Sequence, residues 1–150
     1  MNIPHFLLAT DLMTGSHAVA LKAKALAQKV SGILSIVHVI ELPRLTHYAQ
    51  SLNCSDQLDL ILDNARSILF TISEELNIPL DRQHVVDGNA AELITKLAQT
   101  LKVDAIIIGC HNGSKIASLL GSTAHSILHK AKCDVFTFKV GKAGVVSNDE

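Results

Sequence analysis

Residues that could do chemistry follow the apolar segments of this chain at the points where those segments end. Asp11 comes directly after residues 6–10, and Gly109 directly after residues 105–108, where it opens a loop that runs to Gly121, Ser122 and Thr123 before a helical segment. Glycines let backbone N–H groups approach an anion, and a helix N-terminus adds its free N–H groups. The pattern indicates a phosphate site, although glycines that turn a loop and a hydroxyl that caps a helix explain the same residues.

Short aliphatic segments alternate with longer segments of helical periodicity along the chain. The predicted strands are residues 6–10, 33–40, 84–87, 105–109 and 135–140, and the predicted helices are about 16–30, 56–76, 93–101 and 124–131, with Ser16 as candidate N-cap of the first. Strands with few charges on either face are typical of a parallel sheet covered by helices on both sides. The alternation predicts an α/β fold with a doubly wound five-stranded parallel sheet. Ligands of such sheets bind at the carboxyl ends of the strands.

Length and composition narrow the class of protein. A chain of 150 residues suits one domain, predicted at residues 1–140, followed by a flexible C-terminal tail at residues 141–150. The formal net charge is −1, and the absence of a Lys/Arg cluster argues against a nucleic acid as partner. The sequence shows no signal peptide and no segment for a membrane, and three separated cysteines fit a reducing compartment. We therefore expect a cytoplasmic protein.

The last predicted strand, Val135–Val140, differs from the others. Phe136, Phe138 and Val140 share one face, whereas Thr137 and Lys139 lie on the other. This alternation predicts an edge strand that is covered on one side only. Open edges are paired or guarded, so both a dimer through this edge and a monomer guarded by Lys139 agree with the pattern.

The ordered segments together resemble the universal stress protein family. Residues 6–12, with a serine at the following helix start, resemble the first strand of that family, and residues 35–40 resemble its second strand. Residues 105–109 followed by Gly121 and Ser122 resemble its fourth strand and signature loop. The resemblance covers about residues 3–140. It implies a stress-response or regulatory protein, and because the sequence carries no catalytic motif we expect no enzyme.

The resemblance also implies an assembly and a strand order. Universal stress proteins have the order 3-2-1-4-5 and form homodimers in which the last strands pair antiparallel, here Val135–Val140. The family therefore favours the dimer over the guarded monomer. It further implies a regulatory protein partner, which the sequence does not identify.

The resemblance assigns site residues as well. Family members that bind ATP carry the motif Gly-x2-Gly-x9-Gly-Ser/Thr, whereas UspA-like members do not bind ATP. Gly109 matches the first glycine, and Gly121 with Ser122 matches the closing pair. Asp11 matches an aspartate near the ribose and the metal, and Val39 matches the residue whose backbone meets the adenine.

The signature loop departs from that motif. Asn112 stands where the second glycine is expected, and only eight residues separate it from Gly121. If Gly113 is the second glycine instead, seven residues remain. Asn tolerates positive φ, but a one-residue deletion moves backbone donors by up to ~3.5 Å of chain. Two hypotheses therefore stay open: a protein that binds ATP with Mg²⁺, and a UspA-like protein that acts only through protein–protein contacts.

A remote alternative is a phosphoacceptor receiver domain. It would use Asp11 in an acidic pocket, Asp87 as acceptor and Lys139 as the cation that senses the phosphate. The first strand supplies only one carboxylate, and Lys139 lies within the last strand, so the pattern fits poorly. No G-x-S-x-G segment is present to support a hydrolase.

Overall fold

The computed structural model describes residues 2–42, 55–111 and 121–140. The elements are β1 (His5–Ala9), α1 (Ser16–Lys29), β2 (Ile33–Ile40), α3 (Ser55–Glu75), a 3₁₀ turn (Leu80–Arg82), β3 (Gln83–Asp87), α4 (Ala90–Thr100), β4 (Ala105–His111), α5 (Ser122–Lys130) and β5 (Asp134–Val140). Each predicted strand and helix is present within a few residues of its expected bounds. The predicted tail at residues 141–150 lies outside the described residues.

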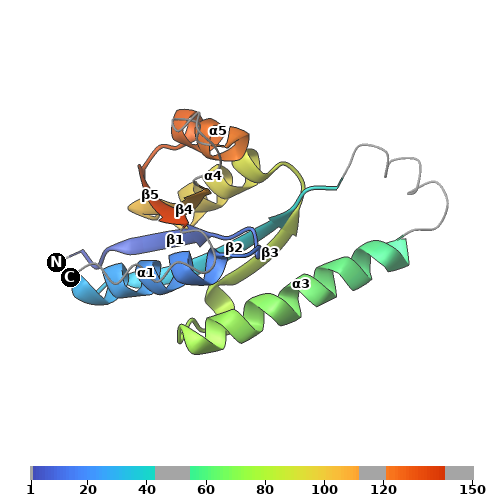
Figure 1. The fold of residues 1–150 in the computed structure, drawn as a ribbon. Coiled ribbons are helices and arrows are strands. Elements are labelled where there is room, and N and C mark those ends of the chain that lie inside the picture. Colours follow the sequence, from blue (N-terminus) through green and yellow to red (C-terminus); the bar gives the residue numbers. More distant parts are fainter. Residues whose placement is uncertain (1, 43–54, 112–120, 141–150) are drawn as a thin grey trace.

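The five strands form one sheet in the order β3-β2-β1-β4-β5, and every neighbouring pair is parallel. The predicted fold class and strand order are therefore confirmed. Helices α1 and α3 cover one face of the sheet, and α4 and α5 cover the other (Figure 1). The order reverses at β1, which lies between β2 and β4, so the crevice expected of a doubly wound sheet lies beside the end of β1.

Each face of the sheet buries its own hydrophobic core. On the face of α1 and α3, Phe6 and Leu8 of β1 pack with Ala23 and Leu69. On the opposite face Leu7 packs with residues of α4 and α5. Successive residues of a strand point to opposite faces, so the continuous apolar segment of β1 fills both cores and fixes the central strand.

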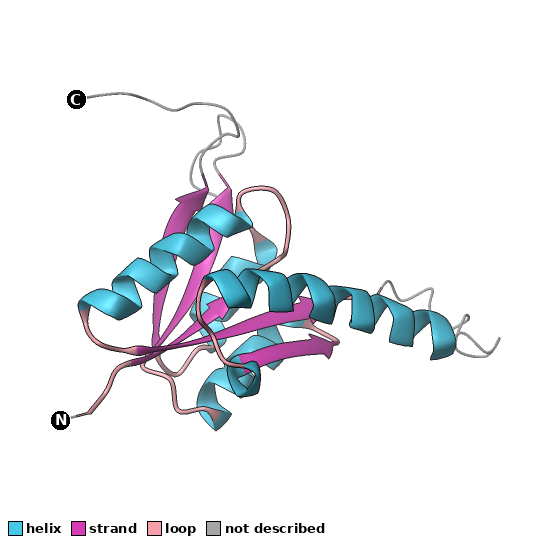
Figure 2. Cartoon of the chain, turned by 90° about the horizontal axis from the view of Figure 1, so that it is seen from below, coloured by secondary structure: helices cyan, strands magenta, loops and turns pink. Residues whose placement is uncertain are grey.

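Helix α3 is packed along only part of its length. Leu69 in its C-terminal half and Leu76 directly after it are buried, whereas its N-terminal half extends beyond the sheet (Figure 2) and leaves Leu60 and Ile61 69% and 46% exposed. The predicted apolar stripe over residues 56–76 is therefore buried only in part. Within the described ranges, none of the helices is long and apolar enough to cross a membrane.

The start of α1 differs from the prediction. The N-cap is Gly15, in the left-handed conformation with φ 91°, and Ser16 is the first helical residue without a capping hydrogen bond. A Cβ atom on Gly15 would overlap Cγ1 of Val140 at the end of β5. The chain therefore needs glycine here, both for the positive φ and for the close approach of β5.

Candidate functional site

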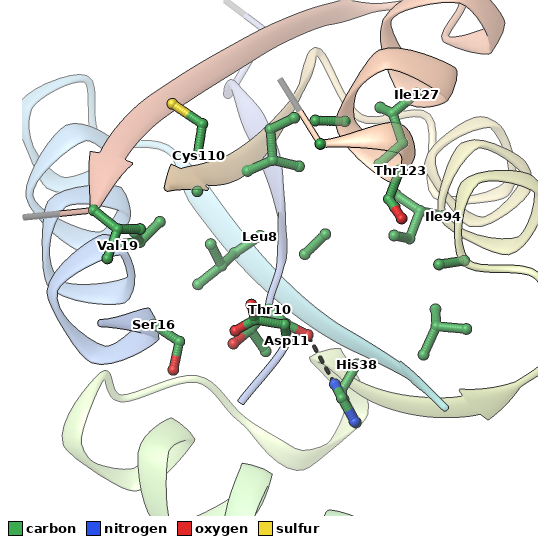
Figure 3. A pocket seen from close by; sticks show the side chains of 18 of the residues that line it. Leu8, Thr10, Asp11, Ser16, Val19, His38, Ile94, Cys110, Thr123 and Ile127 are labelled. Carbon is green, nitrogen blue, oxygen red and sulfur yellow. Dashed lines mark hydrogen bonds between the residues drawn. The ribbon is translucent and has the colours of Figure 1, made fainter. Parts of the chain in front are cut away.

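A cavity of about 610 Å³ lies at the carboxyl ends of β1, β2 and β4, with α4 and α5 beside it (Figure 3). Its lining consists of Leu8, Ala9, Thr10, Asp11, Ser16, Val19, His38, Val39, Glu41, Ala90, Ile94, Ile108, Gly109, Cys110, Gly121, Ser122, Thr123, Ala124, Ile127 and Val140. The walls are mostly aliphatic, and the polar groups stand at the strand ends and helix starts. This is the usual composition of a small-molecule site.

The cavity brings together most of the predicted site residues. Those that line it are Asp11, Val39, Gly109, Gly121, Ser122 and Thr123. The remaining two, Asn112 and Gly113, lie outside the described residues. Segments far apart in the sequence thus meet at one edge of the sheet, as the rule for doubly wound folds predicts.

The turn after β1 holds Asp11 in a defined orientation. The N–H of Met13 donates to Oδ1 of Asp11 at 2.9 Å, and the N–H of Leu12 donates to Oγ1 of Thr10 at 3.1 Å. These two side-chain bonds replace backbone bonds within the turn. Leu12 has φ 58°, which costs a non-glycine residue on the order of 1 kcal/mol and fits a backbone constrained by its surroundings.

The end of β2 contributes His38 beside the same turn. The ring Nδ1 of His38 lies 2.8 Å from the carbonyl oxygen of Thr10 (Figure 3). A carbonyl oxygen only accepts, so Nδ1 carries the hydrogen, and in the neutral ring Nε2 is an acceptor. His38 thereby links the ends of β1 and β2.

Three helix N-termini reach the cavity, those of α1 at Ser16, of α4 at Ala90 and of α5 at Ser122, and that of α4 is satisfied from within the protein. Asn89 is its N-cap and accepts from the N–H of Glu92 at 3.0 Å. Oε1 of Glu41, just beyond β2, accepts from the N–H of Ala90 at 2.7 Å. A carboxylate at this position also interacts favourably with the helix dipole.

The N-terminus of α5 has a different environment. Its N-cap is Gly121, and within the described part of the chain no side chain caps it. Ser122 and Thr123 occupy the first turn and are exposed. Gly121 has an ordinary φ of −54°, and a Cβ atom there would meet nothing within 4 Å. Neither backbone strain nor packing among the described residues requires this glycine, and its first-turn N–H groups are suited to an anion.

Gly109 has a packing role that the sequence did not reveal. The expectation that a loop opens at Gly109 is wrong, because β4 continues to His111 and Gly109 pairs in register with Phe138 of β5. A Cβ atom on Gly109 would lie 3.0 Å from Val19 Cγ2 and 3.2 Å from Val140 Cγ2. The missing side chain therefore lets α1 and β5 close one wall of the cavity.

Glu41 and His38 were not predicted as site residues. Glu41 directly follows β2, and Asp11 follows β1 by two residues, so the rule that identified Asp11 would have found Glu41 had it been applied to every strand. With Asp11 it gives the described lining two carboxylates, and no Lys or Arg stands among these lining residues. The cavity is acidic at the ends of β1 and β2 and rich in donors at α5.

Other candidate residues do not join this site. Asp87, the acceptor in the receiver alternative, ends β3 and does not line the cavity with Asp11. His125 and His129 lie on α5 with ring centroids 4.5 Å apart in a T-shaped contact. Within the described segments no group of three or more His, Cys, Asp or Glu side chains could hold a metal ion.

Comparison with known proteins shows the family to which the chain belongs. A family model described as "Universal stress protein family" matches residues 2–139. The chain belongs to the universal stress protein family. It is 33% identical over 137 residues to Universal stress protein A homolog 1 of Coxiella burnetii, covering 90% of this chain and 95% of that protein. Homolog 2 of the same organism is 36% identical over 122 residues, covering 79% and 82%.

Solved structures share the fold at lower identity. The hypothetical protein MJ0577 superposes with a TM-score of 0.74 at 23% identity, covering 95% of this chain and all of the other. A universal stress protein in complex with cAMP superposes with a TM-score of 0.64 at 17% identity, covering 94% of this chain and all of the other. At these identities the likeness supports the fold, and the ligand must be argued from the cavity.

Proposed function

We propose that this universal stress protein binds an adenine nucleotide, with ATP as the first candidate, and acts in the cytoplasm as a regulatory stress-response protein. One observation carries the proposal: six predicted site residues converge on a single cavity beside the start of α5, which no side chain among the described residues caps. The volume of about 610 Å³ falls within the usual range for small-molecule sites. The cAMP complex of a protein with the same fold agrees with an adenine nucleotide.

The polarity of the cavity sets the orientation of the ligand. Backbone N–H groups and hydroxyls at Gly121–Thr123 suit the phosphates, because they donate and lie at the positive end of the helix dipole. Asp11 supplies carboxylate oxygen, the ligand that Mg²⁺ prefers, and Mg²⁺ bound with the nucleotide would screen this carboxylate from the phosphates. The proposed ligand is therefore nucleotide with Mg²⁺, and its role is regulatory binding rather than catalysis.

Isothermal titration of nucleotide-free protein with ATP and Mg²⁺ tests the proposal. We expect saturable binding that Gly121→Val weakens at least about tenfold, since the new side chain fills space that the phosphates would approach. Gly121→Val should fold normally because a Cβ atom meets nothing there. Thr137→Val is the matched control, because it places the same side chain on exposed β5 outside the cavity.

The titration also separates the two branches of the family. The absence of any heat with ATP or cAMP at millimolar concentration would refute nucleotide binding and favour the UspA-like hypothesis of protein–protein contacts alone. Equal binding by wild type and Gly121→Val would place the nucleotide elsewhere. Weakening by Gly121→Val but not by Thr137→Val would support the cavity at α5.

We further propose a homodimer through β5. This strand ends the sheet, and Phe136 is 40% exposed on it. An edge with open backbone groups and an exposed aromatic ring favours pairing with a second copy. Light scattering should give the mass of a dimer, and Phe136→Glu should give a monomer. Leu128→Glu on α5, where Leu128 is 42% exposed, is the control and should leave the mass unchanged. A monomeric wild-type protein would refute the proposal.

A further inference from the structure

Glu41 stands at the end of the cavity opposite to α5. We propose that its carboxylate makes the site selective for a base that carries an exocyclic amine, as adenine does, over a base with a carbonyl at the same position. This inference deepens the proposed nucleotide binding and depends on it. Glu41 acts here as a specificity-determining residue, and the argument starts from its place in the sheet.

The sheet separates Glu41 from the proposed phosphate end. Glu41 follows β2, the start of α5 lies beyond β4, and β1 stands between these strands. Neighbouring strands are ~4.8 Å apart, so the two ends of the cavity are separated by about 10 Å across the sheet. A nucleotide whose phosphates lie at α5 therefore extends its base past Asp11 toward Val39 and Glu41, which line the same cavity.

The carboxylate of Glu41 is held in place by α4. Its Oε1 accepts from the N–H of Ala90 at 2.7 Å, a donor that has no partner within the helix. Within the described residues Oε2 has no hydrogen-bond partner, and an ionised carboxylate only accepts. One oxygen thus anchors the side chain while the other remains as an acceptor.

The neighbouring groups strengthen this acceptor character. Asp11 adds a second carboxylate to the lining, and no Lys or Arg stands among the described residues of that lining. A ligand must therefore bring donors to this end. The exocyclic amine of adenine is a donor, whereas the carbonyl oxygen of hypoxanthine at the same position is an acceptor and faces repulsion. Hydrogen bonds to charged groups contribute enough to favour the amine by roughly 10- to 100-fold.

Glu41→Gln should reverse this preference. The amide oxygen of Gln can take the place of Oε1 on the N–H of Ala90, because that N–H needs an acceptor. The amide NH₂ then replaces Oε2 and presents a donor to the base. The variant should lose affinity for the amine and gain affinity for the carbonyl, while the start of α4 remains capped.

The experiment measures the affinities of ATP and ITP, each with Mg²⁺, for wild type, Glu41→Gln and Glu92→Gln by isothermal titration. Glu92 lies in the first turn of α4 but does not line the cavity, so Glu92→Gln is the matched control. We expect wild type and the control to prefer ATP by roughly 10- to 100-fold. Glu41→Gln should remove or reverse that ratio.

The outcomes separate this inference from the proposed function. Binding of neither nucleotide by wild type would overturn both. Two results would leave nucleotide binding intact and overturn the role of Glu41. In the first, the dissociation constants of ATP and ITP for wild type differ by less than about threefold. In the second, the ratio of these constants is the same in wild type and in Glu41→Gln. If Glu41→Gln fails to fold, the test uses wild type alone and adds a third nucleotide, the triphosphate of purine riboside. Its base carries neither the exocyclic amine nor the carbonyl. The expected order of affinity is ATP, then this probe, then ITP, and any other order overturns the role of Glu41.

Discussion

The polar groups at the two ends of the parallel strands have different surroundings. At the carboxyl ends Asp11 and Glu41 line a cavity while each also accepts a backbone N–H, and no side chain among the described residues caps the start of α5. At the amino ends the polar groups bind one another. The N–H of His5 donates to Oδ2 of Asp104 at 2.8 Å, and Nε2 of His5 lies 2.8 Å from Oγ of Ser35.

This difference shows how one sheet can divide stability from function. Hydrogen bonds between β1, β2 and the turn before β4 fix the strands at the amino end. The carboxyl end can then carry the polar groups that line the cavity. Parallel strands make this division possible because all their carboxyl ends meet at one edge.

The largest predicted effect concerns the two glycines that precede α1 and α5. Gly15→Ala should lower the free energy of unfolding by about 2–4 kcal/mol, since the new Cβ overlaps Val140 and φ is 91°. Gly121→Ala should change it by less than about 0.5 kcal/mol, because its Cβ meets nothing and its φ is ordinary. Urea unfolding of both variants measures the difference. If both variants lost a similar free energy of unfolding, the start of α5 would be as tightly packed as the contact between Gly15 and β5.

Two buried serines test whether the amino-end hydrogen bonds contribute to stability. Ser35 and Ser73 are 1% and 0% exposed, but Ser35 pairs with His5 whereas Oγ of Ser73 on α3 has no partner in the described part of the chain. Ser35→Ala should cost about 1–2 kcal/mol, because it strips His5 of a partner, and Ser73→Ala should be neutral or stabilise by about 1 kcal/mol. Chemical denaturation gives both values. Equal effects would contradict a stabilising role for the His5–Ser35 bond.

The sequence predicted the architecture well because apolar periodicity and strand–helix order are local signals. Residues 33–40 form β2 as predicted, and the strand order follows from the family resemblance. Asp11, Gly121 and Ser122 could be found because they follow an apolar segment or precede a helical one. These features depend on short stretches of chain.

The residues that were misjudged depend on contacts between distant segments. Gly109 is explained by Val19 and Val140, which approach it from α1 and β5. Ser16 was predicted as the N-cap of α1, but Gly15 has that position. The sequence near Gly15 could not show this, because the contact that requires a glycine comes from Val140, far along the chain. The exposure of Ile61 likewise depends on where the sheet ends beneath α3. No local pattern carries this information.

The smallest predicted effect is a loss of stability in acid that arises at the amino ends. Burial lowers the pKa of His5 below its usual range; nearby Arg82 lowers it further, and the Leu101 carbonyl and Asp104 oppose this. Burial also lowers the pKa of His84, and Asp81 opposes that shift. Nε2 of His84 is buried without a partner among the described residues, which agrees with a neutral ring.

The sign of the effect follows from these directions. A histidine with a lowered pKa in the folded state binds its proton more readily in the unfolded chain, whose pKa is about 6.5. The contribution of His5 and His84 to stability is therefore complete above about pH 6.5 and declines as the pH falls below it. Urea unfolding at pH values from 8 to 5 should show this decline. His84→Gln should make it shallower, whereas His129→Gln, at an exposed position on α5, should not. An unchanged slope in His84→Gln would mean that the amino end buries this histidine without cost, and the contrast between the two ends would then rest on His5 alone.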